Sequence, residues 1–130
     1  MRLELRGRQL VGGSASGPAV VVDAVSFYGD VDPRTGVLRD GRQLGGRVLV
    51  ARRPRGSTVG SYIIYALRAN GVAPAAIVMS RTDPIVVAGC VLASIPLVSD
   101  VPEGELDLIG DGDQVKLIGD GRVIVEKASH

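Results

Sequence analysis

Residues 48–70, VLVARRPRGSTVGSYIIYALRAN, constrain the fold of this chain more than any other stretch. The run Val48-Leu49-Val50 is apolar and β-branched, which suits a buried strand and is too short for a helix. Charged and turn-forming residues interrupt this run: Arg52, Arg53, Pro54, Arg55 and Gly56. Beyond Ser57 and Thr58, side chains recur at the spacing of one helical face, at Tyr62, Ile63, Tyr65, Ala66 and Ala69. The sequence therefore predicts a strand, then a cationic turn, then the start of a helix.

This junction has two interpretations. The first N–H groups of a helix lack intrahelical partners and carry partial positive charge, so with nearby arginines they would stabilise an anion or an oxygen that develops negative charge. Alternatively, Ser57 is an ordinary N-cap and the arginines are solvated. The spacing favours the second interpretation and leaves the first open. It does not assign Arg52, Arg53 and Arg55 individually to a developing alkoxide, to a bound phosphate or to solvent.

Composition excludes several classes of function. The net charge of +1 and the four aromatic residues argue against a nucleic-acid binder. Cys90 and His130 are the only cysteine and histidine, so this chain alone builds no disulfide, zinc or iron–sulfur site. No stretch approaches the roughly 20 apolar residues of a membrane span. We therefore expect a soluble, cytoplasmic protein that binds no metal, nucleic acid or membrane by itself.

The remaining pattern is one of short strands around two helices. The expected strands span residues 2–6, 19–22, 47–50, 75–79 and 95–98, followed by a hairpin of 114–118 and 122–126 about Gly119-Asp120-Gly121. Gly71 ends the first helix, and Asp83-Pro84 opens a second helix that reaches Ser94 and buries Cys90 as a small hydrophobe. Residues 1–130 are thus expected to form a single α/β or β/β/α domain.

The segment SFYGDVDPRTG at 26–36 is the second informative stretch. Its glycines and Asp32-Pro33 predict a loop with defined bends rather than a helix or strand. Phe27 and Tyr28 either pin this loop to the protein or meet a partner or substrate, with Asp30 and Asp32 as its polar groups. The two interpretations are about equally supported.

Four motifs together resemble the small subunits of aconitase X-type hydro-lyases. They are SFYGDVDPRTG at 26–36, RGSTVGSY at 55–62, NGVAPAAIV at 70–78 and AGCVLASIPLV at 88–98. They are most similar to the archaeal enzymes of the family that dehydrate (R)-5-phosphomevalonate. The chain departs from the family at Asp30, where a second glycine is usual, and in a shorter segment between Gly36 and Val48.

The resemblance implies a swivelling β/β/α domain like the mobile domain of aconitases. It also implies an aconitase-like large subunit that carries a 4Fe–4S cluster and most of the active site. The implied reaction converts (R)-5-phosphomevalonate to trans-anhydromevalonate 5-phosphate in the archaeal mevalonate pathway to isoprenoids. By motif, Ser57 is the proton acceptor. Arg55, Gly56, Thr58 and Asp32 are the expected substrate-binding or electrostatic support.

Three alternatives to this function differ in what they predict. Some family members dehydrate cis-3-hydroxy-L-proline, often as single fused chains. A non-catalytic swivelling module would bind or gate a partner without needing Ser57. An anion-binding domain acting alone would bind phosphate esters as the isolated chain, although a single domain of this size seldom encloses such a pocket.

We expect an exposed apolar patch where the large subunit docks, around Phe27, Tyr28 and the helix start at Ser57.

Overall fold

The structure is a computed structural model that describes residues 1–56 and 58–128. Its strands are β1 (Arg2–Arg6), β2 (Arg8–Val11), β3 (Ala15–Val25), β4 (Val48–Pro54), β5 (Ala76–Met79), β6 (Leu97–Ser99), β7 (Gln114–Leu117) and β8 (Arg122–Glu126). Its helices are α1 (Phe27–Asp30), α2 (Gly60–Ala69), α3 (Pro84–Ala93) and α4 (Glu103–Leu106).

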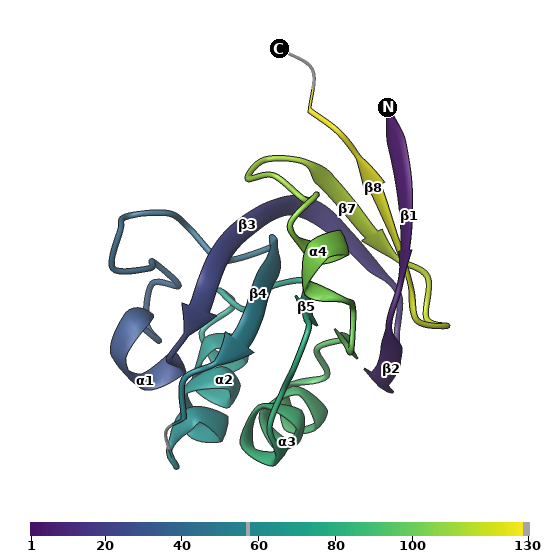
Figure 1. The fold of residues 1–130 in the computed structure, drawn as a ribbon. Coiled ribbons are helices and arrows are strands. Elements are labelled where there is room, and N and C mark those ends of the chain that lie inside the picture. The colour runs from purple at the N-terminus through teal and green to yellow at the C-terminus, as the bar shows by residue number, and fades with distance from the viewer. Residues whose placement is uncertain (57, 129–130) are drawn as a thin grey trace.

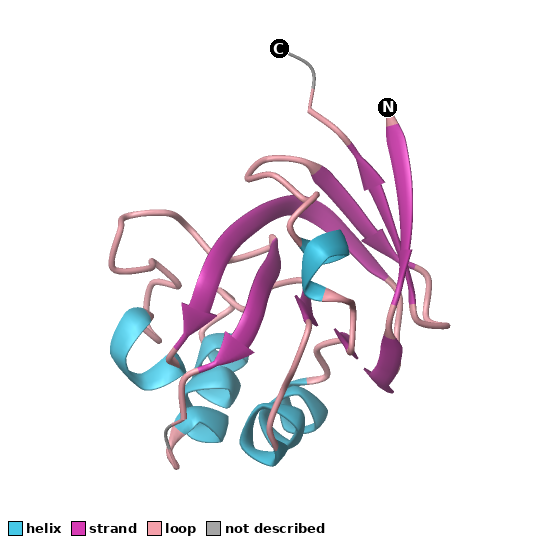
Figure 2. Ribbon diagram, in the orientation of Figure 1, coloured by secondary structure: helices cyan, strands magenta, loops and turns pink. Residues whose placement is uncertain are grey.

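The strands form one sheet in the order β1-β8-β7-β3-β4-β5-β6-β2. The long strand β3 joins two parts of it, since residues 15–18 pair antiparallel with β7 and residues 19–25 pair parallel with β4. Strands β4, β5 and β6 continue in parallel, whereas β1, β8 and β7 pair antiparallel. In Figures 1 and 2, β3 curves from the parallel part to the antiparallel part, and α1, α2 and α3 lie together on the side away from β1, β7 and β8. The result is the β/β/α arrangement expected from the sequence.

The parallel strands are buried on both faces, which explains their continuous apolar runs. Leu49, Ile77 and Leu97 face the helices in one hydrophobic cluster. Val48, Val50 and Val78 belong to a second cluster that includes Val115 and Val125 of the antiparallel hairpin. Two cores therefore hold the parallel sheet between a helical layer and a second β layer.

Most predicted elements are confirmed. Asp83 caps α3 through a 2.8 Å bond from the Val86 N–H, Pro84 occupies its first turn, and it ends at Ser94 in the left-handed conformation. Cys90 is fully buried, and burial raises the pKa of its thiol to about 12. The sequence analysis missed β2 and the single-turn helix α4, because segments of four residues carry too little periodicity to stand out.

The predicted cationic turn is wrong at its start. Strand β4 does not stop before Arg52 but runs through Arg52 and Arg53 to Pro54. The reason is its partner: β3 pairs with β4 as far as Val25 opposite Pro54, and the Arg55 N–H then donates to the Val25 carbonyl at 2.8 Å. Backbone pairing with β3 therefore extends β4 through the arginines and Pro54, which the sequence had indicated as the end of the strand.

Helix α2 also differs from the prediction at its start and in its buried face. Its N-cap is Val59, not Ser57, and Ser57 itself lies outside the described residues. The helix buries Gly60, Ile64 and Leu67. The predicted face is left largely outward, with the Tyr62 and Tyr65 side chains 76% and 52% exposed. The helical spacing of Tyr62 and Tyr65 does not show whether that face of α2 is buried or exposed.

The 26–36 segment is more regular than a bent loop. Ser26 caps the single turn α1, accepting a bond from the Gly29 N–H at 3.2 Å. Phe27 is buried in the core beneath the helices, so its predicted place in a docking patch is wrong, whereas Tyr28 is exposed. Phe27 pins the segment, and Tyr28 is available to a partner.

Candidate functional site

The carboxyl ends of β3, β4, β5 and β6 meet at one edge of the parallel sheet. Ligands of open α/β sheets bind at such an edge, because helix starts and loop N–H groups gather there. Here the edge carries Ser26 after β3, Ser80 after β5 and, after β4, the described residues Arg55, Gly56 and Thr58. Figure 1 shows the ends of β3 and β4 beside α1 and α2. The described motif residues Arg55, Gly56 and Thr58 therefore lie at the edge where the fold would present a site.

Asp30 holds Arg55 at this edge. The Arg55 Nη2 atom lies 3.0 Å from Asp30 Oδ1 and 2.8 Å from Oδ2, and the Ser26 N–H donates to Oδ2 at 2.9 Å. Partial burial would raise the pKa of the Asp30 carboxyl, but the bonds from Ser26 and Arg55 outweigh it and hold that pKa below its usual value. Asp30 is thus ionised at neutral pH and offsets the charge of Arg55.

Asp32 makes only local interactions. Its carboxylate accepts a bond from the Arg34 N–H at 2.9 Å, which lowers the pKa of that carboxyl, and lies 3.9 Å from Arg34 Nε. Its carbonyl accepts from the Gly36 N–H, so Asp32 builds the turn that follows α1. The structure therefore joins Asp30, not Asp32, to Arg55. Both carboxylates do line one surface hollow of ≈ 520 Å³, with Arg39 on the same wall.

Gly56 and Thr58 are exposed, and the structure gives neither a packing role. A Cβ added at Gly56 would meet no atom within 4 Å, so the space around it is open. Ser57, the expected proton acceptor, lies between them and outside the described residues. Of the expected site residues, the structure thus places Arg55, Gly56 and Thr58 along one exposed segment and leaves Asp32 in the neighbouring turn.

Arg52 belongs to the other face of the sheet. Its Nε and Nη2 atoms bond the two carboxylate oxygens of Asp107 at 3.1 and 2.7 Å, and Nε lies 3.5 Å from Asp23. The Asp107 carboxylate raises the pKa of the guanidinium further. Arg52 therefore ties β4 to the end of α4 and is not free for a ligand.

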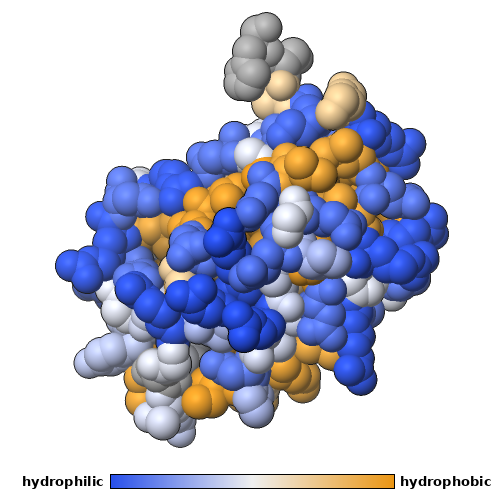
Figure 3. All heavy atoms as spheres, viewed as in Figure 1, coloured by the Kyte–Doolittle hydropathy of each residue, from blue (hydrophilic) through white to orange (hydrophobic). Residues whose placement is uncertain are grey.

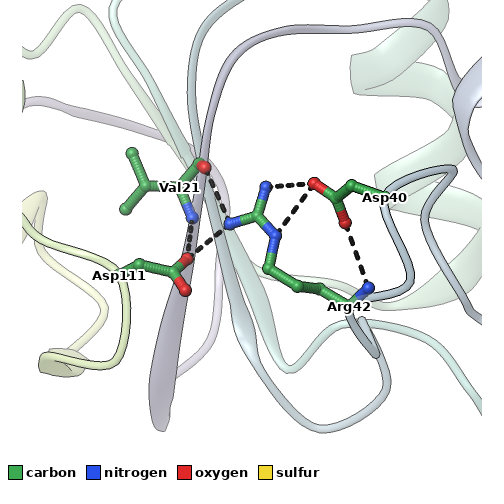
Figure 4. Close-up of polar contacts among 4 residues, drawn as sticks. All are labelled: Val21, Asp40, Arg42 and Asp111. Carbon is green, nitrogen blue, oxygen red and sulfur yellow. Dashed lines mark hydrogen bonds and ion pairs between the residues drawn. The ribbon is translucent and has the colours of Figure 1, made fainter.

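The segment between Gly36 and Val48 is anchored by Arg42. Figure 4 shows its guanidinium between two carboxylates and the main chain of β3. It donates to Asp40 at 2.6 Å, to Asp111 at 2.6 Å and to the Val21 carbonyl at 3.0 Å, while Asp111 accepts from the Val21 N–H. This network ties the segment to the middle of β3. Nothing in the sequence analysis singled out Arg42, because its partners lie up to 69 residues away.

The described residues do not fit an iron–sulfur cluster or another metal. No group of three or more His, Cys, Asp or Glu side chains within residues 1–56 and 58–128 could hold an ion. The one cysteine is buried in α3 with a protonated thiol. In the same part of the chain, no helix is long and apolar enough to cross a membrane.

The fold and this edge define a β/β/α swivel domain whose arginine-bearing segment follows a central parallel strand. The chain belongs to the aconitase X swivel domain family, whose model matches residues 4–126. It is 58% identical over 123 residues to a protein of Aeropyrum pernix named phosphomevalonate dehydratase small subunit, covering 95% of this chain and 93% of that one. A Methanocella arvoryzae protein of the same name is 41% identical, with 94% and 98% covered.

A solved structure agrees with these relatives. The crystal structure of Thermococcus kodakaraensis aconitase X in its holo-form superposes with a TM-score of 0.88 at 37% identity, covering 96% of this chain and 99% of the other. The expected family and the expected fold are therefore confirmed.

Proposed function

We propose that this chain is the small subunit of a phosphomevalonate dehydratase. The complex would remove water from (R)-5-phosphomevalonate to give trans-anhydromevalonate 5-phosphate. The observation that carries the proposal is the 58% identity to the Aeropyrum pernix small subunit across nearly the full length of both chains. A name shared by several archaeal relatives supports the same substrate.

Ser57 is the proposed proton acceptor. The proposal rests on the RGST motif at 55–58, since dehydration needs a proton taken from a carbon next to a carboxylate. A serine hydroxyl is a useful base only if its alkoxide is stabilised, and removing one donor from such a site typically costs about 2.7–4 kcal/mol of barrier. Arg55, two residues before Ser57, and the positive end of α2, which begins at Gly60, are the proposed sources of that stabilisation.

The ion pair with Asp30 affects how Arg55 would stabilise the alkoxide. Because Asp30 offsets its charge, Arg55 contributes directed N–H groups more than net positive charge. Its side chain is 60% exposed, so part of the guanidinium stays open to a substrate or partner. Asp30 would fix the direction in which those donors point.

The large subunit is the proposed partner, and the edge at residues 55–58 is the proposed face toward it. If Ser57 acts there, the rest of the active site must lie opposite that edge. Tyr28 of α1 and Val59 at the start of α2 expose 68% and 38% of their surface beside it. Figure 3 shows hydrophobic atoms among hydrophilic ones at the lower end of the view, where this edge lies.

The 4Fe–4S cluster implied by the resemblance is assigned to the large subunit, since the described residues of this chain do not fit one. We place the assembled enzyme in the cytoplasm.

Reconstitution tests the proposal. This chain and an aconitase-like large subunit are co-expressed, purified without oxygen, and assayed with (R)-5-phosphomevalonate and with cis-3-hydroxy-L-proline. Dehydration of phosphomevalonate that needs both chains is the expected result. If the complex dehydrates cis-3-hydroxy-L-proline but not (R)-5-phosphomevalonate, the proposed substrate is wrong. An inactive complex with an intact cluster would favour the non-catalytic partner-binding module. Affinity of the isolated chain for phosphate esters would favour the anion-binding domain.

A further inference from the structure

The arginines at the carboxyl edge fall into two groups by their partners. Arg52 is paired with Asp107 and Asp23, and Arg55 is paired with Asp30. Arg53 and Arg81 differ, because no ion pair or side-chain hydrogen bond reaches either guanidinium from the described part of the chain. Both side chains are exposed. Two cations at this edge are therefore available to an anion.

Arg53 lies in β4, and Arg81 follows the neighbouring strand β5 by two residues. Strand β4 pairs with β5 in parallel, with Ala51 opposite Met79. Beyond that pair, the N–H groups of Ser80 and Arg81 both donate to the Arg52 carbonyl, at 3.2 and 2.9 Å. The main chain at Arg81 thus lies against the peptide that joins Arg52 to Arg53. Two like charges on neighbouring segments repel, and an anion bound by both would offset that repulsion.

The segment that carries Arg81 also has unmet hydrogen-bonding capacity. The hydroxyl oxygens of Ser80 and Thr82 are shielded from solvent and have no partner within the described residues, and Ser80 is only 9% exposed. Such groups are uncommon in folded proteins, and a bound anion is one partner that would complete their hydrogen bonding. The next residue, Asp83, is already engaged, since it caps α3 through the Val86 N–H.

We propose that Arg53 and Arg81 bind the phosphate group of the substrate, with the Ser80 and Thr82 hydroxyls turning to complete the site. This inference rests on the proposed function, which supplies a phosphorylated substrate. Guanidinium groups suit this task because their planar forks match phosphate oxygens. It divides the arginines that sequence spacing left unassigned: Arg52 is structural, Arg55 belongs with Asp30, and Arg53 with Arg81 recognises phosphate.

The test uses the assembled complex with Arg53→Gln, Arg81→Gln and the double variant. The matched control is Arg68→Gln, since Arg68 is also exposed without an ion pair in the described chain but lies in the last turn of α2, toward the opposite edge. Loss of a charged hydrogen bond should raise KM for (R)-5-phosphomevalonate about tenfold or more per arginine, with kcat within about twofold of wild type. Competitive inhibition by inorganic phosphate should weaken in parallel, and the lysine variants should retain part of both.

Thermal melting and co-purification with the large subunit check that each variant is folded. An unchanged KM and phosphate inhibition constant, as in Arg68→Gln, would overturn the inference while the wild-type activity upholds the proposed function. A wild-type complex that does not turn over phosphomevalonate would overturn the function instead. Calorimetric titration of the complex with inorganic phosphate then tests the role of Arg53 and Arg81 independently of turnover. Phosphate binding that Arg53→Gln and Arg81→Gln abolish supports the inference, and phosphate binding that these variants leave unchanged contradicts it.

Discussion

The Arg55 guanidinium lies 2.8 Å from the Asp30 carboxylate across 25 residues of sequence, which fixes the segment after β4 to the turn after β3. The Asp30 side chain is 19% exposed against 60% for that of Arg55, so the carboxylate is the more buried partner of the pair. The pair links two of the four motifs that carry the family resemblance, those at 26–36 and 55–62.

We predict that Asp30 and Arg55 act as a unit in catalysis. Arg55→Gln should lower kcat of the assembled enzyme about a hundredfold, because it removes a donor and leaves a carboxylate beside the reacting centre. The double variant Asp30→Asn/Arg55→Gln should be less impaired than Arg55→Gln alone, with a coupling of about 1–2 kcal/mol in a double-mutant cycle on kcat/KM. Strictly additive effects of the two substitutions on kcat/KM would contradict the prediction that Asp30 and Arg55 act together.

Arg122→Gln and Asp120→Asn provide the control for this cycle. Arg122 and Asp120 form a similar half-exposed pair at 2.9 Å, but in the β7–β8 hairpin. Their variants should leave kcat unchanged and shift the melting temperature little, as expected of an exposed ion pair.

Tyr28 should matter for assembly and not for folding. Tyr28→Ser removes an exposed aromatic side chain from the edge proposed to face the large subunit, so we expect about tenfold weaker binding to it, as for an aromatic contact in an interface. Val91→Ser is the control, since Val91 is similarly exposed near the end of α3, toward the opposite edge. Binding measured by surface plasmon resonance decides, and equal affinities for the two variants would remove Tyr28 from the interface.

Gly89 should tolerate no side chain. A Cβ there would lie 2.8 Å from Ile64 Cδ1 and 3.1 Å from the Ser61 main chain, where α3 approaches α2. Gly89→Ala should lower the free energy of unfolding by about 1–3 kcal/mol, the usual cost of overpacking. Gly104→Ala, in α4 with nothing within 4 Å, should be neutral or slightly stabilising. Urea denaturation of both variants measures the difference, and equal midpoints would contradict the packing argument.

The predictable part of the fold is where local pattern and tertiary pairing agree. The Asp83-Pro84 start of α3 and the Gly119-Asp120-Gly121 hairpin follow from local chemistry alone, so sequence was sufficient. The sequence predicts too early an end for strand β4, because the extension of the strand past Arg52 depends on its pairing with β3, which the charged residues and the proline do not reveal. The outward face of α2 was misjudged because tyrosine suits both a core and a surface.

The candidate site was predictable only as a segment. Sequence motifs led to residues 55–58 and to Asp32, but the carboxylate that holds Arg55 is Asp30. Partners so far apart in sequence leave no spacing signal, so the pairing of each arginine emerged only from the folded chain. The same holds for Ser80 and Thr82, whose unmet hydroxyls depend on burial.

Asp113 should make stability depend on acid pH. Its side chain is 4% exposed and accepts bonds from Lys127 Nζ, the Ala128 N–H and the Gly110 N–H. Burial alone would raise the pKa of this carboxyl, but these donors outweigh it and lower the pKa below the unfolded value. The stabilisation is therefore present above the unfolded pKa of about 3.9 and is lost as pH falls through the lower folded pKa.

Asp113→Asn should cost about 1–3 kcal/mol at pH 7 and flatten the acid limb of the stability profile below about pH 4. Asp120→Asn, an exposed carboxylate of the hairpin, serves as its control. Thermal melting from pH 2 to 7 measures both, and a variant whose profile keeps the wild-type slope would contradict this role.

The turnover of Ser57→Ala tests the central claim most directly. The variant is assembled with its large subunit, purified without oxygen and compared with Ser14→Ala, whose serine lies exposed in the turn before β3. Loss of a general base should lower kcat for (R)-5-phosphomevalonate by about a hundredfold to ten-thousandfold while KM and complex formation change little. A Ser57→Ala complex that turns over substrate like Ser14→Ala would contradict the assignment of Ser57 as the proton acceptor.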